Sequence, residues 1–578
     1  MKKNNINIVA GLPPVAKKGQ QVTMDFEMFD QIQGKLHRPN GSFALISVKL
    51  ETDPTVYQLY DEKDLRKLVK VVKAGTWTFH NALYDLRQFR RYATVDPRFI
   101  WDTMLVEQAM NGGLYQNFGL ADLTRRWLGR SMEKETREHF YQRRELGPQE
   151  KEYAAIDVIN TEEIAILQSR RYQGDAGMRA YMLADEPMIF PILDLQGFRV
   201  DVEGWEIMVK EFERYGKEIE EELGFNVYSQ AQVLSAMQKR EHIKLLNTQK
   251  ETLEEFMEVP LVQRIIEARM YRRASSTYGM KWLEKHVEAD GKVYSDYKIT
   301  GADTTGRMSS SGPNMQNIPQ RKLPQYRERF KASDGNIIGV WDVSQQEPSI
   351  TAYHSQDRRL LDALRAGESL HLAVAREIYD CPTLTKSENK MEYSHGKAIN
   401  LGLTYGLTVH GLAKRTGMTV EQAESMIHKY FMQYSGVHSY IQTQRQKAAR
   451  DGYITTALGR RSYINPWDHK WENNAINSPI QGGAADFTKI WGRKTWEKTL
   501  AAGLPHTMVA FVHDETVYDT PRKIAKKMKP IIQEAFNETA EFLYKNIPFA
   551  VEYEYGNTWA AKSIETERIS LDEEDTDE

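Results

Sequence analysis

Apolar and polar residues alternate strictly in one short stretch near the N-terminus. Val22, Met24 and Phe26 are each separated by a polar residue, a period of two that predicts a half-buried strand. Asp25 and Glu27 then lie on the same face of that strand, one pleat repeat apart, where a divalent cation could bridge them. Taken alone, two such acids are more often explained as the solvated face of an ordinary strand.

Further along the chain, the sequence predicts a domain junction, a long amphipathic helix and a region of alternating strands and helices. The polar, glycine-bearing residues 172–177 come after a helical run and predict a domain junction. From about 290 to 560, predicted strands and helices alternate. Between these regions, apolar residues at three- and four-residue spacing predict a long amphipathic helix: Met208, Phe212, Tyr215, Ile219 and Leu223.

Length and composition narrow the class of protein. A chain of 578 residues implies several domains. Its mean hydropathy of −0.60 and the lack of a long apolar stretch exclude a membrane protein. The apolar residues 8–12 are too few for a signal peptide. Cys381 is the single cysteine of the sequence, which excludes an intramolecular disulfide and a cysteine-based zinc cluster and predicts a cytoplasmic protein.

Charge is unevenly distributed. The 77 basic and 80 acidic side chains sum to −3, but residues 564–578 hold eight acids and one arginine. We expect this segment to be a disordered acidic tail, and its removal leaves a net +4. Residues 264–286, predicted as one helix, carry six basic and two acidic side chains. This helix suits phosphate contacts with DNA, although a solvated helix face is the alternative.

Two further acids strengthen the case for a metal site in the N-terminal third. Asp85 follows the apolar run 77–79, and Asp157 comes four residues after Tyr153. Residues four apart share one face of a helix, so Tyr153 and Asp157 can address the same site. These positions, with Asp25 and Glu27, resemble the Asp-Glu-Asp-Asp-Tyr signature of proofreading 3′–5′ exonucleases over residues 1–172.

This resemblance implies an RNase H-like α/β domain, 1–175, in which Asp25, Glu27, Asp85 and Asp157 hold two divalent metal ions. It assigns Tyr153 to orient the attacking water. Asp102, in the sequence Trp-Asp-Thr, is an additional matching residue. Two bound cations would activate the water and stabilise the departing 3′ oxygen. A degenerate, purely structural domain is disfavoured because all five signature positions are intact.

Two acids in the C-terminal part follow strand-like runs. Asp342 ends the apolar run 336–341, and Asp514 lies between the β-prone runs 508–512 and 516–518. Both are predicted at a strand end or hairpin turn, where a metal and a phosphate could reach them. Between them, a lysine, a leucine and a tyrosine recur at i, i+4 and i+8, on one predicted helix face: Lys397, Leu401 and Tyr405.

The order and spacing of these residues resemble family A DNA polymerases over about 178–562. The sequences at 305–310, 313–319, 452–461 and 477–482 add to the match. The resemblance implies a right-hand polymerase domain, 176–563. Its expected parts are a thumb (about 205–300), a palm (about 301–360 and 462–563) and fingers (about 361–461). An exonuclease joined to a polymerase, with no 5′-nuclease domain, is typical of a bacteriophage or bacterial replication enzyme.

The same resemblance implies residue roles. Asp342 and Asp514 would hold two Mg²⁺ ions, for which Mn²⁺ can substitute, in a two-metal phosphoryl transfer. Lys397 and His371 would contact the triphosphate, Tyr405 would stack at the nascent base pair, and Glu347 would exclude a ribose 2′-hydroxyl. Glu515 would support the metal site. The remaining implied substrate and DNA contacts are Gln345, Arg307, Asn477, Gln481 and His513.

Three positions depart from the family pattern. Tyr393 and Asn473 each replace an arginine, of which the first normally contacts the triphosphate. Lys390, seven residues before Lys397 and so on nearly the same helix face, is our candidate substitute. Leu401 stands where the family has Phe or Tyr. Leucine offers no hydroxyl, which predicts strong discrimination against dideoxynucleotides.

Other functions are weaker explanations of the sequence. A nuclease whose C-terminal part only clamps DNA leaves Asp342, Asp514 and Lys397 unexplained. A non-catalytic replisome scaffold would need both acidic sets to be idle, and Glu347 disfavours an RNA-synthesising relative. The expected ligands are primer–template DNA and deoxynucleoside triphosphates. The expected partners of this monomer are a helicase, a primase or a single-strand-binding protein.

Overall fold

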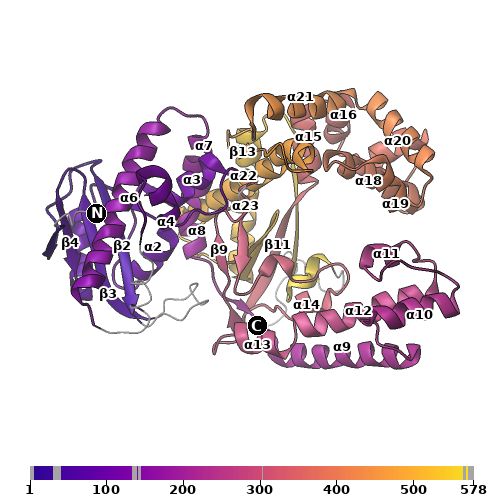
Figure 1. The fold of residues 1–578 in the computed structure, drawn as a ribbon, viewed down its shortest axis with the longest axis horizontal. Coiled ribbons are helices and arrows are strands. Elements are labelled where there is room, and N and C mark those ends of the chain that lie inside the picture. The colour runs from indigo at the N-terminus through magenta and orange to yellow at the C-terminus, as the bar shows by residue number, and fades with distance from the viewer. Residues whose placement is uncertain are drawn as a thin grey trace.

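The computed structural model describes residues 6–29, 41–132, 140, 145–302, 304–563 and 568–569 (Figure 1). No helix within these ranges is long and apolar enough to cross a membrane. The predicted acidic tail lies outside them except for two residues. Ile569 N donates to Tyr555 O at 2.7 Å, and Arg568 pairs with Glu554 at 3.3 Å. These two residues pack on a palm strand, and the disorder expected of the tail stays a prediction.

The N-terminal domain is built on a six-stranded mixed sheet of order β1-β4-β3-β2-β5-β6, at the left of Figure 1. β2 lies inside the sheet, antiparallel to β3 and parallel to β5. Helices pack on the sheet, in agreement with the expected α/β domain. The strands are β1 (Asn7–Ala10), β2 (Gln21–Phe29), β3 (Ser42–Leu50), β4 (Thr55–Leu59), β5 (Thr76–Phe79) and β6 (Ile100–Asp102). The helices are α1 (Leu65–Val72), α2 (Ala82–Phe89), α3 (Thr103–Asn111), α4 (Leu120–Leu123) and α6 (Pro148–Arg171).

The predicted alternation in β2 is confirmed. Val22, Met24 and Phe26 are at most 1% exposed, whereas Asp25 and Glu27 are half-buried on the other face. Each large apolar side chain buried here contributes about 1.5–3 kcal/mol, which is enough to hold the register of the strand. The two acids therefore keep fixed positions.

The helical arm expected to be the thumb is α9 (Val202–Leu223), α10 (Gln230–Arg240), α11 (Lys250–Glu254), α12 (Pro260–Thr277) and α13 (Met280–His286). The predicted amphipathic helix is α9, although Tyr215 is 38% exposed. The predicted single helix 264–286 is wrong, because α12 ends before Gly279 and α13 begins after it. A Cβ at Gly279 would lie 2.2 Å from Ser275 O, so only glycine allows this close turn.

A four-stranded antiparallel sheet of order β14-β15-β11-β16 forms the expected palm. β11 lies between β15 and β16, and Asp342 is opposite Glu515 and Glu552. The palm strands are β11 (Asn336–Ser344), β14 (Met508–Val512), β15 (Glu515–Pro521) and β16 (Ala550–Gly556). The palm helices are α15 (Gln346–Ser355), α22 (Trp471–Ala501) and α23 (Arg522–Leu543).

The helices expected to be the fingers lie on the opposite side of the palm sheet from the thumb (Figure 1). Lys414 Nζ pairs with Glu255 Oε1 at 2.5 Å, so the two arms touch at their tips. The finger helices are α16 (Arg358–Arg365), α17 (Leu370–Tyr379), α18 (Lys390–Thr404), α19 (Val409–Thr416), α20 (Val420–Gln433) and α21 (Ser435–Asp451). Smaller elements include α7 (Met178–Ala180), α8 (Ile189–Leu193), α14 (Gln325–Glu328), β12 (Tyr453–Thr455) and β13 (Arg461–Tyr463).

A buried ionic network ties the segment after the exonuclease domain to the palm. Arg460 binds Asp185 through both terminal nitrogens, at 2.9 and 2.7 Å, and Asp486 through Nε at 2.8 Å. Lys489 Nζ lies 2.5 Å from Asp185. All four side chains are at most 2% exposed. Burial alone would raise the pKa of Asp185, but Arg460 and Lys489 outweigh it and the pKa is lowered.

We expect Arg460→Ala to destabilise the protein by about 3–5 kcal/mol, because it leaves two buried carboxylates without their main partner. Its neighbour Arg461 pairs with a half-buried Asp175 and provides the control. Arg461→Ala should cost about 1 kcal/mol or less. Thermal unfolding followed by circular dichroism measures both, and equal shifts in the midpoint would contradict a special role for the buried network.

Candidate active sites

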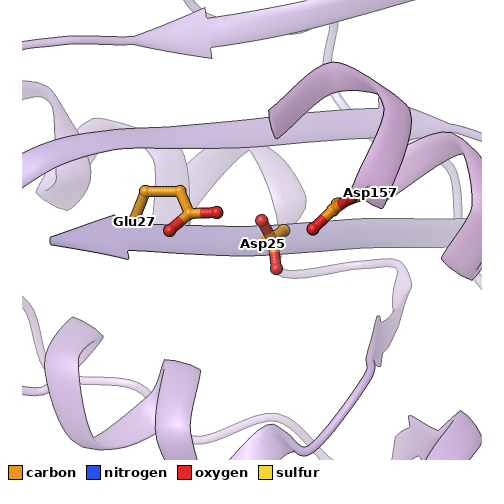
Figure 2. A group of neighbouring side chains, drawn as sticks. All are labelled: Asp25, Glu27 and Asp157. Carbon is orange, nitrogen blue, oxygen red and sulfur yellow. The ribbon is translucent and has the colours of Figure 1, made fainter. Parts of the chain in front are cut away.

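Three acids gather in the exonuclease domain. Asp25 and Glu27 come from β2 and Asp157 from α6, and one carboxylate oxygen of each lies within 4.8 Å of the others (Figure 2). Carboxylate oxygens at this spacing can share a hard divalent cation such as Mg²⁺. Without a cation, the three negative charges repel one another. The donor set therefore fits the metal that the sequence predicts.

Asp85 lies next to this group and outside it. It sits on α2, is 2% exposed, and its Oδ1 accepts a hydrogen bond from Phe26 N at 2.8 Å. Burial first, and then the charge of Asp25, raise the pKa of Asp85 well above its usual value. Tyr153 is on α6 one turn before Asp157, and its ring lies 6.2 Å from that of Phe140. The roles of Asp85 and Tyr153 stay predictions.

Asp102 caps the N-terminal ends of two helices, α2 and α3. Its carboxylate accepts hydrogen bonds from two backbone N–H groups at the start of α3, at 2.9 and 3.2 Å. It accepts two more from Asn81 and Ala82, at 3.1 and 2.8 Å, where α2 begins. Because one carboxylate caps two helices, it fixes the direction in which α2 presents Asp85.

The palm brings Asp342 and Asp514 together. Asp514 occupies a two-residue turn between β14 and β15, where His513 adopts a left-handed backbone (φ 58°). Val343 N donates to Asp514 O at 3.3 Å, which holds the turn against β11. Burial first, and then Asp514, raise the pKa of Asp342 to about 7, although an ion pair with Lys562 opposes the shift. Burial also raises the pKa of Asp514. Two acids held in this way fit cation binding.

Glu515 is bound by two side chains of the protein itself, Arg327 and Trp559. It is 3% exposed, Arg327 Nη1 lies 3.1 Å from its Oε1, and Trp559 Nε1 donates to the same oxygen at 2.7 Å. Its charge is therefore already neutralised within the protein. Its expected supporting role beside the metal site stays a prediction.

A cavity of about 340 Å³ opens beside Asp514. Arg307, Glu347 and His513 line it. Glu347 pairs with Arg307 and accepts a hydrogen bond from the hydroxyl of Tyr405. Burial and then Glu347 raise the pKa of Tyr405, which keeps the phenol neutral. The structure thus joins three predicted substrate contacts from three distant segments.

The finger helices carry the predicted triphosphate contacts. Lys397 and Leu401 lie on α18, and Tyr405 follows its last residue. His371, on α17, is 8% exposed and its Nδ1 lies 3.1 Å from Asn400 Nδ2. Burial and then Lys397 lower the pKa of His371 to about 4, so it is neutral at pH 7.

Gln345 links these helices to the palm. Its side-chain carbonyl accepts a hydrogen bond from Leu370 N at 2.7 Å, at the start of α17. The two predicted DNA contacts Asn477 and Gln481 lie on α22. Asn473, one turn earlier, packs against Gly406. A Cβ at Gly406 would lie 1.7 Å from Asn473 Oδ1, so the glycine leaves the space that the Asn473 side chain occupies beside the turn after Tyr405.

The basic residues of 264–286 are partly used inside the thumb. Arg264 pairs with Glu222 and Glu267, and Arg272 lies 3.6 Å from Glu220. Arg269 donates to the backbone of Thr248 and Val227. The predicted DNA-binding helix face is therefore smaller than its charge suggests. Arg273, Lys281 and Lys285 remain exposed.

Sequence reasoning missed several residues at these sites: Lys562, Arg327, Trp559 and Lys386. Lys562 pairs with Asp342 from a segment 220 positions away, and no local pattern marks it. One sequence signal could have shown that the chain around Lys562 is packed. It is the group of Trp559, two tyrosines and a glycine near the last strand, because aromatic residues there predict a packed segment rather than a tail. Lys386 lies over the Tyr393 ring, 5.6 Å from its centroid.

Comparison with known proteins gives the family. Residues 204–561 match the model of DNA polymerase family A, and residues 16–167 match a 3′–5′ exonuclease model. The first match covers more than half of the chain, so the chain belongs to DNA polymerase family A and carries a 3′–5′ exonuclease domain.

Bacterial relatives and a solved structure agree with this assignment. The chain is 27% identical to DNA polymerase I of Aquifex aeolicus over 555 residues, which are 89% of this chain and 93% of that protein. It is 33% identical to DNA polymerase I of Pseudomonas aeruginosa over 320 residues, 54% of this chain, and spans about a third (34%) of that longer protein. The structure "POL domain of Pol1 from M. smegmatis complex with DNA primer-template and dNTP" matches at a TM-score of 0.80 and 22% identity. It covers 96% of this chain and 99% of that one, and shows the shared fold.

The two neighbouring palm acids should affect stability in opposite directions in metal-free buffer. Asp514→Asn removes the carboxylate that repels Asp342, so we expect a higher thermal midpoint. Glu515→Gln leaves Arg327 buried without its countercharge, at a cost of about 3–5 kcal/mol. Differential scanning fluorimetry in EDTA measures both variants. A fall in the midpoint for both would mean that Asp514 is held by favourable contacts instead.

Proposed function

We propose that this chain extends the 3′ end of a DNA primer with deoxynucleotides on a DNA template, and that its exonuclease domain removes mispaired 3′ ends. The observation that carries the proposal is the pair of acidic centres in separate domains, Asp342 with Asp514 and Asp25 with Glu27 and Asp157. Each centre lies in the domain whose family model matches the chain there.

Both kinds of domain depend on divalent metal ions, and the acids described above would hold them. Carboxylate oxygens without thiolate or imidazole donors favour Mg²⁺, with Mn²⁺ as a substitute. The bound cations would make an oxygen nucleophile more acidic and offset charge on the phosphate that is transferred. In the exonuclease domain, Asp85 is the fourth proposed ligand, and Tyr153 would orient the attacking water.

The residues of the finger helices would bind and orient the nucleotide. Lys397 would contact the triphosphate and could protonate the pyrophosphate as it leaves. His371 is neutral, so it can donate one hydrogen bond to a phosphate oxygen while its other nitrogen faces Asn400. Tyr405 and Glu347 are hydrogen-bonded to each other and would together shape the position of the sugar and base.

The wider biological role is proposed on the same basis. The bacterial relatives support DNA replication as the process, with primer–template DNA and deoxynucleoside triphosphates as ligands. A phage origin, a monomeric state, a cytoplasmic location and replisome partners such as a helicase stay predictions from the sequence.

Primer extension with Mg²⁺ tests the proposal. Asp342→Ala should abolish synthesis, by at least about 100-fold, while 3′ degradation continues. Asp25→Ala should abolish 3′ degradation and leave synthesis intact. If Asp342→Ala synthesised DNA normally, the polymerase site would lie elsewhere. If the unaltered protein only degraded primers, the nuclease with a DNA clamp would be the better explanation.

Leu401 should determine discrimination against chain terminators. It is half-buried on α18 one turn after Lys397 and has no hydroxyl to replace the missing 3′-hydroxyl of a dideoxynucleotide. We expect Leu401→Tyr to raise dideoxynucleotide incorporation by about 100-fold or more relative to the deoxynucleotide. Leu401→Phe is the matched control and should change little. Competitive incorporation on a single-base template measures the ratio, and comparable incorporation of both nucleotides by the unaltered protein would refute the idea.

A further inference from the structure

Tyr393, where the family resemblance implies a phosphate-binding arginine, is part of a small stack of side chains in this protein. Tyr393 lies on α18, one turn before Lys397. Lys386 Nζ lies over its ring, 5.6 Å from the centroid. The ring of His371 meets Tyr393 edge to face, with centroids 6.4 Å apart. An aromatic face attracts a cation, so Tyr393 can hold Lys386 near His371 and Lys397.

Positive charge accumulates near Lys397. Lys386, Lys397, Arg321 and Arg415 form no ion pair with any carboxylate in the described part of the chain. Burial lowers the pKa of Lys397, and repulsion from Arg321, Lys386 and Arg415 lowers it further. Lys386 also contributes to the low pKa of His371. Cations that repel one another in the free protein favour a polyanionic ligand, which would relieve the repulsion.

We propose that Lys386, held against the ring of Tyr393, binds the triphosphate of the incoming nucleotide and supplies the charge of the missing arginine. This inference rests on the proposed polymerase function and deepens it. Lys390, the candidate suggested by sequence spacing, is the first residue of α18, and both it and Lys386 are exposed. The cation over the Tyr393 ring is Lys386, four residues earlier, so tertiary contact and sequence spacing point to different lysines.

Single-nucleotide insertion on a primer–template with Mg²⁺ tests the assignment. Lys386→Ala should raise the KM for the deoxynucleotide about five- to tenfold and change kcat less than twofold. Lys386→Arg should stay within about twofold of the unaltered protein. Lys526→Ala removes an exposed lysine of α23 and is the control for loss of surface charge. Lys390→Ala should raise KM less than Lys386→Ala does.

Tyr393 is a positioning residue in this scheme, and a double-mutant cycle tests it. Tyr393→Phe keeps the ring and should keep the KM, whereas Tyr393→Leu should raise it. Combining Tyr393→Leu with Lys386→Ala should raise KM little beyond Lys386→Ala alone, because the ring acts through the lysine. Additive effects would show that Tyr393 does not act through Lys386 and would overturn this part of the proposal.

Inorganic tripolyphosphate separates this inference from the proposed function. Calorimetry on the full chain should show binding that Lys386→Ala weakens about five- to tenfold and Lys526→Ala does not. Equal KM values and equal tripolyphosphate affinities for these two variants would overturn the assignment, as would a larger effect of Lys390→Ala. If the unaltered protein extended no primer, the proposed function would fail, and the tripolyphosphate measurement would still decide whether Lys386 belongs to an anion site. Unchanged 3′ degradation and thermal midpoint would exclude misfolding.

Discussion

The constraint on which both active sites depend is the cost of holding carboxylates together. Burial and, after it, like charges a few ångströms apart raise the pKa of a carboxyl group and oppose folding; burial first and then Asp514 raise the pKa of Asp342 to about 7. Both domains meet this cost in the same way. A strand carries one or two acids, Asp342 on β11 or Asp25 and Glu27 on β2, and a further acid reaches it from a separate element, Asp514 from a hairpin turn or Asp157 from α6.

Positive charge is distributed according to the same constraint. Lys562 faces Asp342, and Arg327 neutralises Glu515, so the acids of the palm differ in how far the protein itself balances them. Arg460 and Lys489 neutralise buried acids at the domain junction, where nothing but the protein can do so. Among the described residues, the cations around Lys397 form no ion pair with a carboxylate. A site that leaves its charge unbalanced in the free protein is prepared for a charged ligand.

Local sequence patterns predicted those parts of the sites that lie on single elements. The alternation around Asp25 and Glu27 located them on one strand face, and the i, i+4 spacing put Tyr153 and Asp157 on one helix. The strand-like runs around Asp514 located it at a hairpin turn, whereas Asp342, predicted at a strand end or turn, lies inside β11 and is paired on both sides. Local pattern failed for the basic segment 264–286. The segment forms two helices that meet at Gly279, where Ser275 O leaves no room for a side chain, and three of its arginines bind partners that charge counting could not reveal.

By itself, the sequence determined which residues are chemically equipped, in what order, and on which strand or helix face, because the periods of strands and helices are local properties of the backbone. Tertiary structure alone decided which of them meet. Asp102 became a double helix cap, Glu515 an internal ion pair, and Lys386 the cation over Tyr393. The physical reason is range. Hydrogen bonds and ion pairs act over a few ångströms of space, and the residues they join here are up to several hundred positions apart in the chain.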